Sequence, residues 1–110
     1  RGLDTSLFLL PLEEWGKLAD KLGGLPLGQA NSRAFARLML AGAMDTRLDK
    51  QGRFIIPEYL RQYAGLKKDV VMVGIQNRLE IWDKAAWVAY AKKAEEDATA
   101  IAEQLGAMGI

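Results

Sequence analysis

Apolar positions in the first quarter of the chain change from an unbroken run to a helical spacing. The run at residues 7–10, Leu-Phe-Leu-Leu, predicts a short buried strand. A helix is predicted over residues 11–22, because the proline at its first position loses no hydrogen bond there. Trp15, Leu18 and Leu22 recur at helical spacing and form one apolar face, and the Gly-Gly pair that follows ends the helix.

A second helical pattern follows a short linker. Residues 25–28, Leu-Pro-Leu-Gly, are predicted to be that linker. Asn31 or Ser32 can cap the next helix, because either side chain accepts hydrogen bonds from first-turn amides. The apolar residues then lie along one side as far as Gly42, which predicts a helix that connects two parts of the chain.

The second half of the chain is richer in predicted strands. The predicted elements are strands at 46–49, 53–56, 70–73 and 78–82, a short helix at 57–64 and an Ala-rich helix at 84–105. Asp83 is the predicted cap of the long helix. The apolar side of that helix is wide, so we expect it to pack on the connecting helix of its own or a neighbouring chain.

The start of the chain aligns with its last third when it is shifted by 72 positions. The identical pairs are Gly2 with Gly74, Leu7 with Leu79, Trp15 with Trp87, Ala19 with Ala91 and Lys21 with Lys93. Strand falls on strand and helix on helix, which predicts an internal duplication with both tryptophans in the core. The counterpart of residues 49–53 would lie before residue 1, and the chain starts without Met. We therefore expect a trimmed protein whose first copy is incomplete.

The predicted hairpin at 46–56 separates its apolar and charged residues. Leu48 and Phe54 point toward one face of a strand pair, where a core would lie. Asp49 and Arg53 point toward the other face and meet at the mouth of the loop. This separation predicts an ordered hairpin with a charged outer face.

The loop of this hairpin carries the candidate chemistry. Lys50-Gln51-Gly52 forms a three-residue connection in which the glycine suits a positive φ. Asp49 can orient the guanidinium of Arg53, whose planar fork fits a phosphate or a guanine edge, and Lys50 adds positive charge at the tip. The spacing alone also fits an ordinary surface ion pair, which contributes little to stability.

Composition excludes several classes of function. The chain of 110 residues has no Cys and no His, which removes zinc sites and most nucleophile–base pairs. Ser6 and Ser32 are its only serines, and no glycine loop for phosphate binding is present. We therefore expect no enzyme activity, no cofactor, no metal and no small-molecule substrate.

Charge and hydropathy bear on the partners. The formal net charge is only +1, so a nucleic-acid footprint would have to be local. Residues 40–82 hold seven Lys or Arg against five acids, whereas residues 83–110 hold three against five. No apolar run is long enough to form a membrane helix, so we expect no membrane partner.

An ordered set of motifs carries a family resemblance. Residues 49–57, Asp-Lys-Gln-Gly-Arg-Phe-Ile-Ile-Pro, and 60–66, Leu-Arg-Gln-Tyr-Ala-Gly-Leu, resemble the MraZ family of bacterial transcriptional regulators. The similarity continues in residues 70–74, 77–82 and Trp87, and includes residues 11–15 and 37–43. It therefore spans nearly the whole chain.

The resemblance implies a fold and a division of the chain. It implies an α+β, SpoVT/AbrB-like fold in which two repeats build a β-barrel-like core, with a connecting helix and a C-terminal helix. Residues 1–27 would be the remnant of the first repeat, 28–43 the connecting helix, and 44–110 the second repeat with the C-terminal helix.

The resemblance also implies a function. The family's D-x-x-x-R signature, which contacts DNA, falls on Asp49 and Arg53. The expected DNA-binding residues are therefore Arg53, Asp49, Lys50, Arg47 and Gln51. The partners would be double-stranded DNA, at tandem repeats in the promoter of the division and cell-wall gene cluster, and further copies of the chain in a ring. The expected location is the cytoplasm, at the nucleoid, and the expected role is mainly repression.

A rival interpretation comes from a different class of protein. The near-zero net charge and the missing first hairpin also fit a protein-assembly module that does not bind DNA on its own. Salt dependence separates the two, because release of counterions from DNA makes binding fall steeply with salt concentration.

Overall fold

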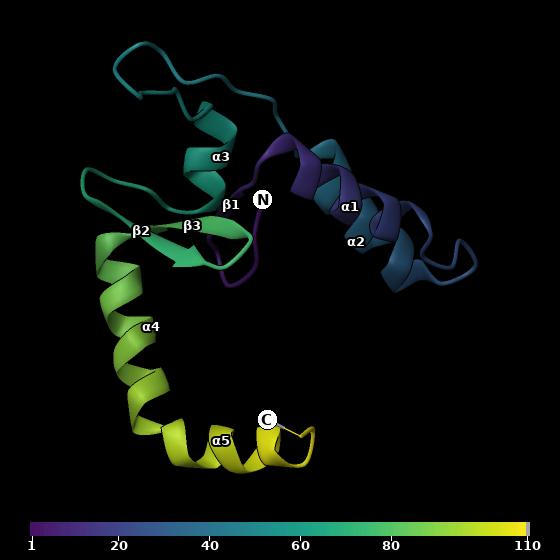
Figure 1. Cartoon of the computed structure of the whole chain (residues 1–110), viewed down its shortest axis with the longest axis vertical. Helices are drawn as coiled ribbons and strands as arrows, with labels where there is room; N and C mark the ends of the chain where they lie inside the picture. The colour runs from purple at the N-terminus through teal and green to yellow at the C-terminus, as the bar shows by residue number, and fades with distance from the viewer. Residues whose placement is uncertain (110) are drawn as a thin grey trace.

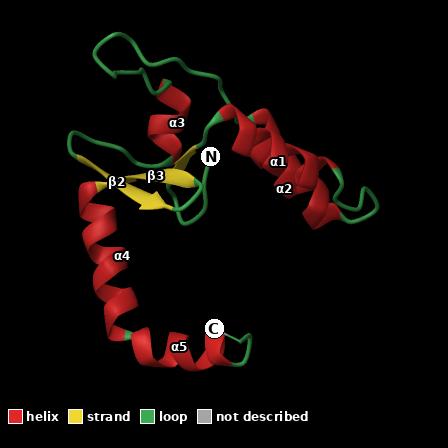
Figure 2. Cartoon of the chain, viewed as in Figure 1, coloured by secondary structure: helices red, strands yellow, loops and turns green. Residues whose placement is uncertain are grey.

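The structure, a computed structural model, describes residues 1–109 and mixes helices with a small sheet (Figure 1). The strands are β1 (Leu7–Leu9), β2 (Val70–Ile75) and β3 (Arg78–Asp83), and the helices are α1 (Leu12–Gly23), α2 (Ala30–Ala41), α3 (Glu58–Tyr63), α4 (Lys84–Glu96) and α5 (Ala98–Gly106). Figure 2 shows a long loop between α2 and α3, at the top of the view. This loop contains residues 49–53, so the candidate site lies outside regular secondary structure.

The three strands form one antiparallel sheet in the order β1-β3-β2. β2 and β3 are a hairpin whose last pair is Ile75 opposite Arg78. β1 pairs with the other edge of β3, with Phe8 opposite Glu80. Because β3 is the central strand it is covered best, and Ile81 is among its buried residues.

The hydrophobic core lies between the sheet and α3. Leu7 of β1, Ala64 just after α3 and Ile81 of β3 are its buried members. The partly buried side chains packed against them are Leu9, Phe54, Ile56, Leu60, Tyr63 and Leu66. Phe54 and Ile56 come from the end of the long loop, so the core holds that end of the loop in place.

Two helix pairs project from the sheet in different directions (Figure 1). α1 and α2 pack on each other and bury Leu22 and Met39. α4 leaves the end of β3, and α5 continues from it at a steep angle. Within the described chain α4 contacts β2, β3 and α5 in place of the connecting helix, so the predicted packing on that helix stays a prediction for a neighbouring chain only.

An aromatic cluster joins α4 to the sheet. Trp82 of β3 is buried, and its ring meets that of Trp87 edge-on with 5.4 Å between centroids. The ring of Tyr90, one helical turn further on, lies 4.8 Å from that of Trp82. Trp87 therefore packs on its own strand as predicted, although Trp82 is the more deeply buried of the two tryptophans.

The predicted strands at 46–49 and 53–56 are absent. Only the amide of Asp49 and the carbonyl of Arg53 pair across the loop, at 2.8 Å, and no ladder continues beyond them. An isolated two-stranded hairpin is marginal in water, and no third strand lies beside these arms in the described part of the chain. The apolar alternation at 53–56 therefore marks a segment in which only Phe54 and Ile56 are partly buried, whereas residues 46–49 are all exposed.

Two predictions about helix caps also fail. Neither Asn31 nor Ser32 caps α2, which begins at Ala30 without a side-chain cap. The Asp83 carboxylate precedes α4 but accepts a hydrogen bond from the amide of Lys67, at 3.2 Å, in place of an α4 amide.

The predicted long helix at 84–105 is divided. Asp97, with φ −95° and ψ 5°, separates α4 from α5. It follows Glu95 and Glu96, and three consecutive acids are unfavourable at the C-terminal end of a helix, where the carbonyl dipoles are negative. Asp is also a weak helix former, so the break falls on it.

The shift of 72 positions relates elements as well as residues. α1 begins at Leu12 and α4 at Lys84, so the two helix starts coincide under this shift. β1 falls on the middle of β3, and Phe8 pairs with Glu80, its own shifted position. Each of the two related segments thus contains a strand followed by the start of a helix. The two strands, β1 and β3, pair antiparallel, and the pair Phe8–Glu80 lies at the centre of their contact.

Candidate nucleic-acid interface

Residues 49–53 form a tight turn that depends on glycine. The amide of Gly52 donates to the carbonyl of Asp49 at 3.0 Å, and the amide of Asp49 donates to the carbonyl of Arg53 at 2.8 Å. Gly52 has φ +77°, in the left-handed region where a Cβ is costly. The sequence Asp-x-x-Gly-Arg therefore folds into this turn largely on its own.

The carboxylate of Asp49 lies at the centre of the turn. Its Oδ1 accepts hydrogen bonds from the amides of Gln51 and Arg53, at 2.9 and 2.8 Å. Its Oδ2 accepts a third from Nε of Arg53 at 3.1 Å. One side chain thus fixes both the backbone of the turn and the direction of the arginine, and only its contact with the arginine was predicted from the spacing.

These contacts change the acidity of Asp49. The backbone amide of Arg53 is the main cause that holds the pKa of the Asp49 carboxyl below its ordinary value. Desolvation raises this pKa and so opposes the amide. The Gln51 amide and the Arg53 guanidinium lower it further. Asp49 is therefore ionised at neutral pH, which is the form that can orient a cation.

The guanidinium of Arg53 is held at one edge and open at the other. Its side chain is 73% exposed, and its terminal nitrogens make no hydrogen bond with other residues in the range 1–109. An arginine fixed through Nε presents both terminal nitrogens as a fork, which fits two phosphate oxygens or the O6 and N7 edge of guanine. Such an arrangement can bind a polyanion without first ordering its own side chain.

The side chains of the other predicted site residues, in and beside this turn, are exposed and are held by fewer contacts. Lys50 and Gln51 occupy its tip, and the side chains of both are exposed. Arg47 is also exposed, two residues before Asp49, and donates no side-chain hydrogen bond to another described residue. The structure thus brings Asp49, Gln51 and Arg53 into contact, and leaves Lys50 and Arg47 as free positive charges.

The loop that contains this turn, residues 43–56, is called the Asp49 loop below. Helix α3 holds it at both ends: the hydroxyl of Tyr59 donates to the carbonyl of Gly42 at 3.0 Å. Nη1 of Arg61 donates to the carbonyl of Ile56, also at 3.0 Å. Neither residue is predicted from the sequence. The Tyr59 contact joins residues seventeen positions apart, and no local pattern indicates it.

Comparison with known proteins identifies the family. The sequence model of the MraZ protein family matches residues 39–107, which include the whole Asp49 loop and α3. The chain belongs to the MraZ family. Proteins named transcriptional regulator MraZ are 46% identical to it in Acetivibrio thermocellus, 47% in Desulfitobacterium hafniense and 48% in Pediococcus pentosaceus. Each of these matches covers the full chain and 77% of the relative.

The MraZ family model covers only part of the fold. The family model covers the Asp49 loop, the β2–β3 hairpin and both C-terminal helices. β1, α1 and most of α2 precede residue 39, although the aligned relatives extend over them. The candidate turn therefore lies within the part of the chain that defines the family.

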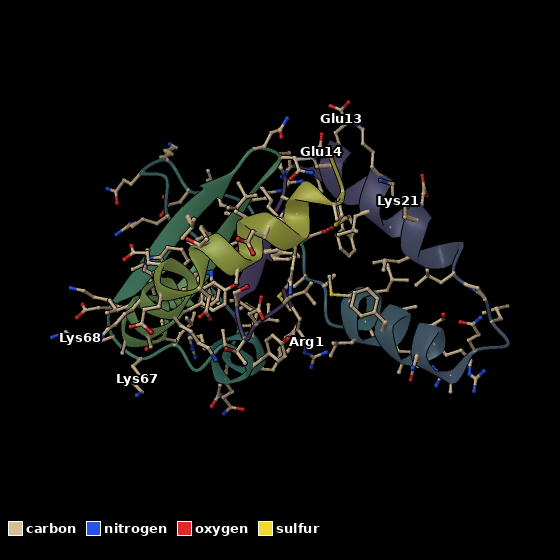
Figure 3. All side chains as sticks on the ribbon, turned by 90° about the horizontal axis from the view of Figure 1, so that it is seen from below. Arg1, Glu13, Glu14, Lys21, Lys67 and Lys68 are labelled. Atoms are coloured by element: carbon tan, nitrogen blue, oxygen red, sulfur yellow. The ribbon has the colours of Figure 1, made fainter. Side chains whose placement is uncertain are left out.

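Other basic residues of this MraZ-family chain are differently disposed. Lys67 and Lys68 extend outward at the edge of the molecule in Figure 3, and both are exposed. Arg78 is instead engaged: it pairs with Glu80 at 3.1 Å and lies 4.8 Å above the centre of the Phe8 ring. Arg78 is thus occupied within the sheet and is a poor candidate for contact with a phosphate.

An apolar groove lies beneath the Asp49 loop. Its volume is about 740 Å³, and it lies between β1, the start of α1 and the loop. Trp15 lines it and is half-buried, so its predicted place in the core is only partly realised. Leu12, Leu48 and Ile55 also line it and are 75%, 63% and 82% exposed. These values show that the groove is open to solvent in the isolated chain.

No helix in residues 1–109 is both long and apolar enough to cross a membrane. In the same range there is no group of three or more acidic side chains placed to hold a metal ion.

Proposed function

We propose that the chain is a sequence-specific DNA-binding transcriptional regulator. The observation that carries this proposal is the arrangement of Asp49 and Arg53, in which a charged carboxylate holds an exposed guanidinium by Nε and leaves its fork open. The membership of the MraZ family and the name of its relatives support the same function.

In this proposal the residues of the turn have different roles. Arg53 contacts a phosphate or a guanine edge, and Asp49 fixes its direction. Lys50 and Arg47 contact phosphates as mobile point charges, and Gln51 faces the duplex at the tip of the turn. Specificity therefore resides in Arg53 and Gln51, while the two other cations mainly add salt-dependent affinity.

The proposed target and assembly follow from the family resemblance. The chain would bind tandem repeats in the promoter of the division and cell-wall gene cluster, at the nucleoid, as a ring-shaped homo-oligomer. One turn offers few contacts, so several turns on one oligomer would raise the affinity through effective concentration. A two-repeat fold, with residues 1–27, 28–43 and 44–110 as its parts, is included in this proposal. It is supported by the strand and helix start that coincide under the 72-residue shift.

The test is a mobility-shift titration with the promoter region of the chain's own gene. We expect Arg53→Ala to raise the Kd for this duplex tenfold or more, because a bidentate arginine contact is worth about 1–3 kcal/mol per site and several sites add. We expect Asp49→Asn to raise Kd less, since the amide oxygen can still accept the backbone hydrogen bonds. The matched control is Lys93→Ala, which removes an exposed cation from α4, outside the Asp49 loop.

Unchanged promoter binding by Arg53→Ala would count against DNA binding by this turn. If Arg53→Ala and Lys93→Ala bind the promoter as wild type does, the assignment of Arg53 is lost. Circular dichroism and the thermal midpoint of each variant establish that the fold persists, which the 73% exposure of Arg53 leads us to expect.

A second candidate function is a protein-assembly module that does not bind DNA. The exposed apolar groove favours it, and so does α5, where Ile101 is 42% exposed and Met108 beyond the helix is 74% exposed. Binding through several phosphates falls steeply with salt, by about 0.9 log unit per contact for each log unit of salt. Assembly through apolar surface gives a flat or rising response, so one salt series separates the two functions.

A further inference from the structure

The two arms of the Asp49 loop are held very differently. The exit arm is secured by the core, because Phe54 and Ile56 pack against it. The entry arm has no such support: residues 43–48 are all exposed, and residues 44–48 make no hydrogen bond with other described residues. What limits the entry arm is therefore its starting point, at the end of α2.

That starting point is tied to α3 through a single hydroxyl. Tyr59 of α3 donates its hydroxyl hydrogen to the carbonyl of Gly42, the residue that ends α2. Gly42 is buried, and a Cβ there would lie 2.6 Å from Nη1 of Arg1 and 2.8 Å from the carbonyl of Leu38. The backbone at Gly42 is thus tightly surrounded, and the Tyr59 hydrogen bond fixes it relative to the helix that also holds the exit arm.

Arg1 completes the arrangement from the other side. Its guanidinium lies 5.9 Å from the centre of the Tyr59 ring and 5.5 Å from that of Tyr63. The same guanidinium donates to the carbonyl of Leu38 at 3.3 Å. Figure 3 shows Arg1 near the middle of the molecule, between α2 and α3. The Arg1 guanidinium therefore packs against the ring of Tyr59, whose hydroxyl donates to the carbonyl of Gly42.

We propose that Tyr59 is a positioning residue for DNA recognition: its hydroxyl holds the entry arm of the Asp49 loop so that Arg53 meets the duplex in the binding-competent direction. This inference rests on the proposed function, since it assigns Tyr59 to the same site. Tyr59 need not touch DNA. It raises the fraction of loops that are ready to bind, and the apparent Kd equals the intrinsic Kd divided by that fraction.

The chain offers a closely matched control on the same helix. Tyr63 lies one turn after Tyr59, faces the same Arg1 guanidinium, and donates its hydroxyl to the carbonyl of Gly2 at 2.8 Å. Tyr59→Phe and Tyr63→Phe each remove one hydroxyl and one hydrogen bond to a glycine carbonyl, and each keeps the ring over Arg1. Only the first frees the Asp49 loop.

The experiment uses the full chain, a duplex of the promoter region of its own gene and a scrambled duplex of the same composition. For Tyr59→Phe we expect the Kd for the promoter duplex to rise roughly three- to tenfold, the range that loss of one hydrogen bond produces. Binding to the scrambled duplex and the salt slope stay unchanged, because the phosphate contacts are intact. Amide exchange at Ala43, which follows Gly42 and donates to the carbonyl of Leu40, becomes faster. For Tyr63→Phe we expect none of these changes.

Three outcomes decide the question. Equal promoter binding by the two tyrosine variants overturns the positioning role of Tyr59. The role is also overturned if Tyr59→Phe binds both duplexes more weakly by the same factor and its thermal midpoint falls further than that of Tyr63→Phe. If Arg53→Ala, measured in parallel, binds like wild type, the proposed function itself fails, and the role of Tyr59 in it fails as a consequence.

Discussion

The β2–β3 hairpin and the Asp49 loop both reverse the chain within a few residues, but different forces hold them. The hairpin is fixed by a ladder of six paired positions, from Val70 opposite Asp83 to Ile75 opposite Arg78. It tolerates a positive φ of 35° at Gln76 in its turn. The turn of the Asp49 loop has two backbone hydrogen bonds, and its shape comes from the Asp49 carboxylate and Gly52.

The difference teaches where each region is vulnerable. A ladder distributes its stability over many backbone groups, so no single side chain of the hairpin surface defines it. The Asp49 loop concentrates its order in a few contacts, so one substitution can remove its shape and leave the core untouched. Binding by such a loop can therefore be changed without unfolding the protein, and the following predictions exploit that separation.

The largest expected effect falls on the sheet side of the comparison. Ile81→Ala removes a buried side chain of β3 that is 4% exposed. We expect the free energy of unfolding to fall by about 2–5 kcal/mol, the usual cost of truncating a buried Ile to Ala. Chemical denaturation measures it. Because Phe54 and Ile56 pack on the same cluster, the Kd of the folded fraction for promoter DNA should rise far less than in Arg53→Ala, and an equal rise would contradict the separation.

A smaller effect on stability, with a larger one on binding, is expected at Gly52. Gly52→Ala places a Cβ on a residue with φ +77°, which costs about 1–2 kcal/mol of local strain. The site is exposed, with no heavy atom within 4 Å of the added Cβ, so the cost is conformational and not steric. We expect promoter affinity to fall severalfold, and the thermal midpoint to fall by only several degrees, less than in Ile81→Ala. The control is Gly28→Ala, which also has open space around the Cβ and lies in the linker before α2.

The smallest expected effect is the pH dependence of the turn. The folded pKa of Asp49 lies below the ordinary value of 3.8, so its contribution is fully present above that value and is lost as pH falls through the folded pKa. Affinity should therefore stay constant from pH 8 to pH 5 as far as Asp49 is concerned. Chemical shifts of the Gln51 and Arg53 amides, which donate to Asp49, should report its titration below pH 4. A midpoint above 4 would contradict the lowered pKa.

Much of the fold could be predicted from the sequence because the signals were local. Pro11 and the Gly-Gly pair bracket α1, and the apolar run at 7–10 contains β1. The sequence also predicts the β2–β3 hairpin, although β2 continues two residues beyond the predicted strand, to Ile75. In each case the spacing of neighbouring residues carries the information, and tertiary contacts reinforce it.

The failures share a different cause. The strands predicted at 46–49 and 53–56 need a neighbouring strand, and none lies beside them among the described residues. For the candidate site, the contact of Asp49 with Arg53 followed from a spacing of four residues, whereas the tie from Tyr59 to Gly42 depends on how α3 packs against the end of α2. Contacts between distant residues leave no trace in a local pattern.

The turn at residues 49–53 divides its positions into two kinds, and this division has a consequence for how such regulators can diverge. Asp49 and Gly52 set the path of the backbone, whereas the side chains of Lys50 and Gln51 are exposed and make no hydrogen bond with another described residue. Under the proposed function, replacement of the second pair alters the surface that faces a duplex while the first pair preserves the fold of the turn. On that proposal a lineage exchanges its preferred operator one residue at a time, without passing through an unfolded intermediate.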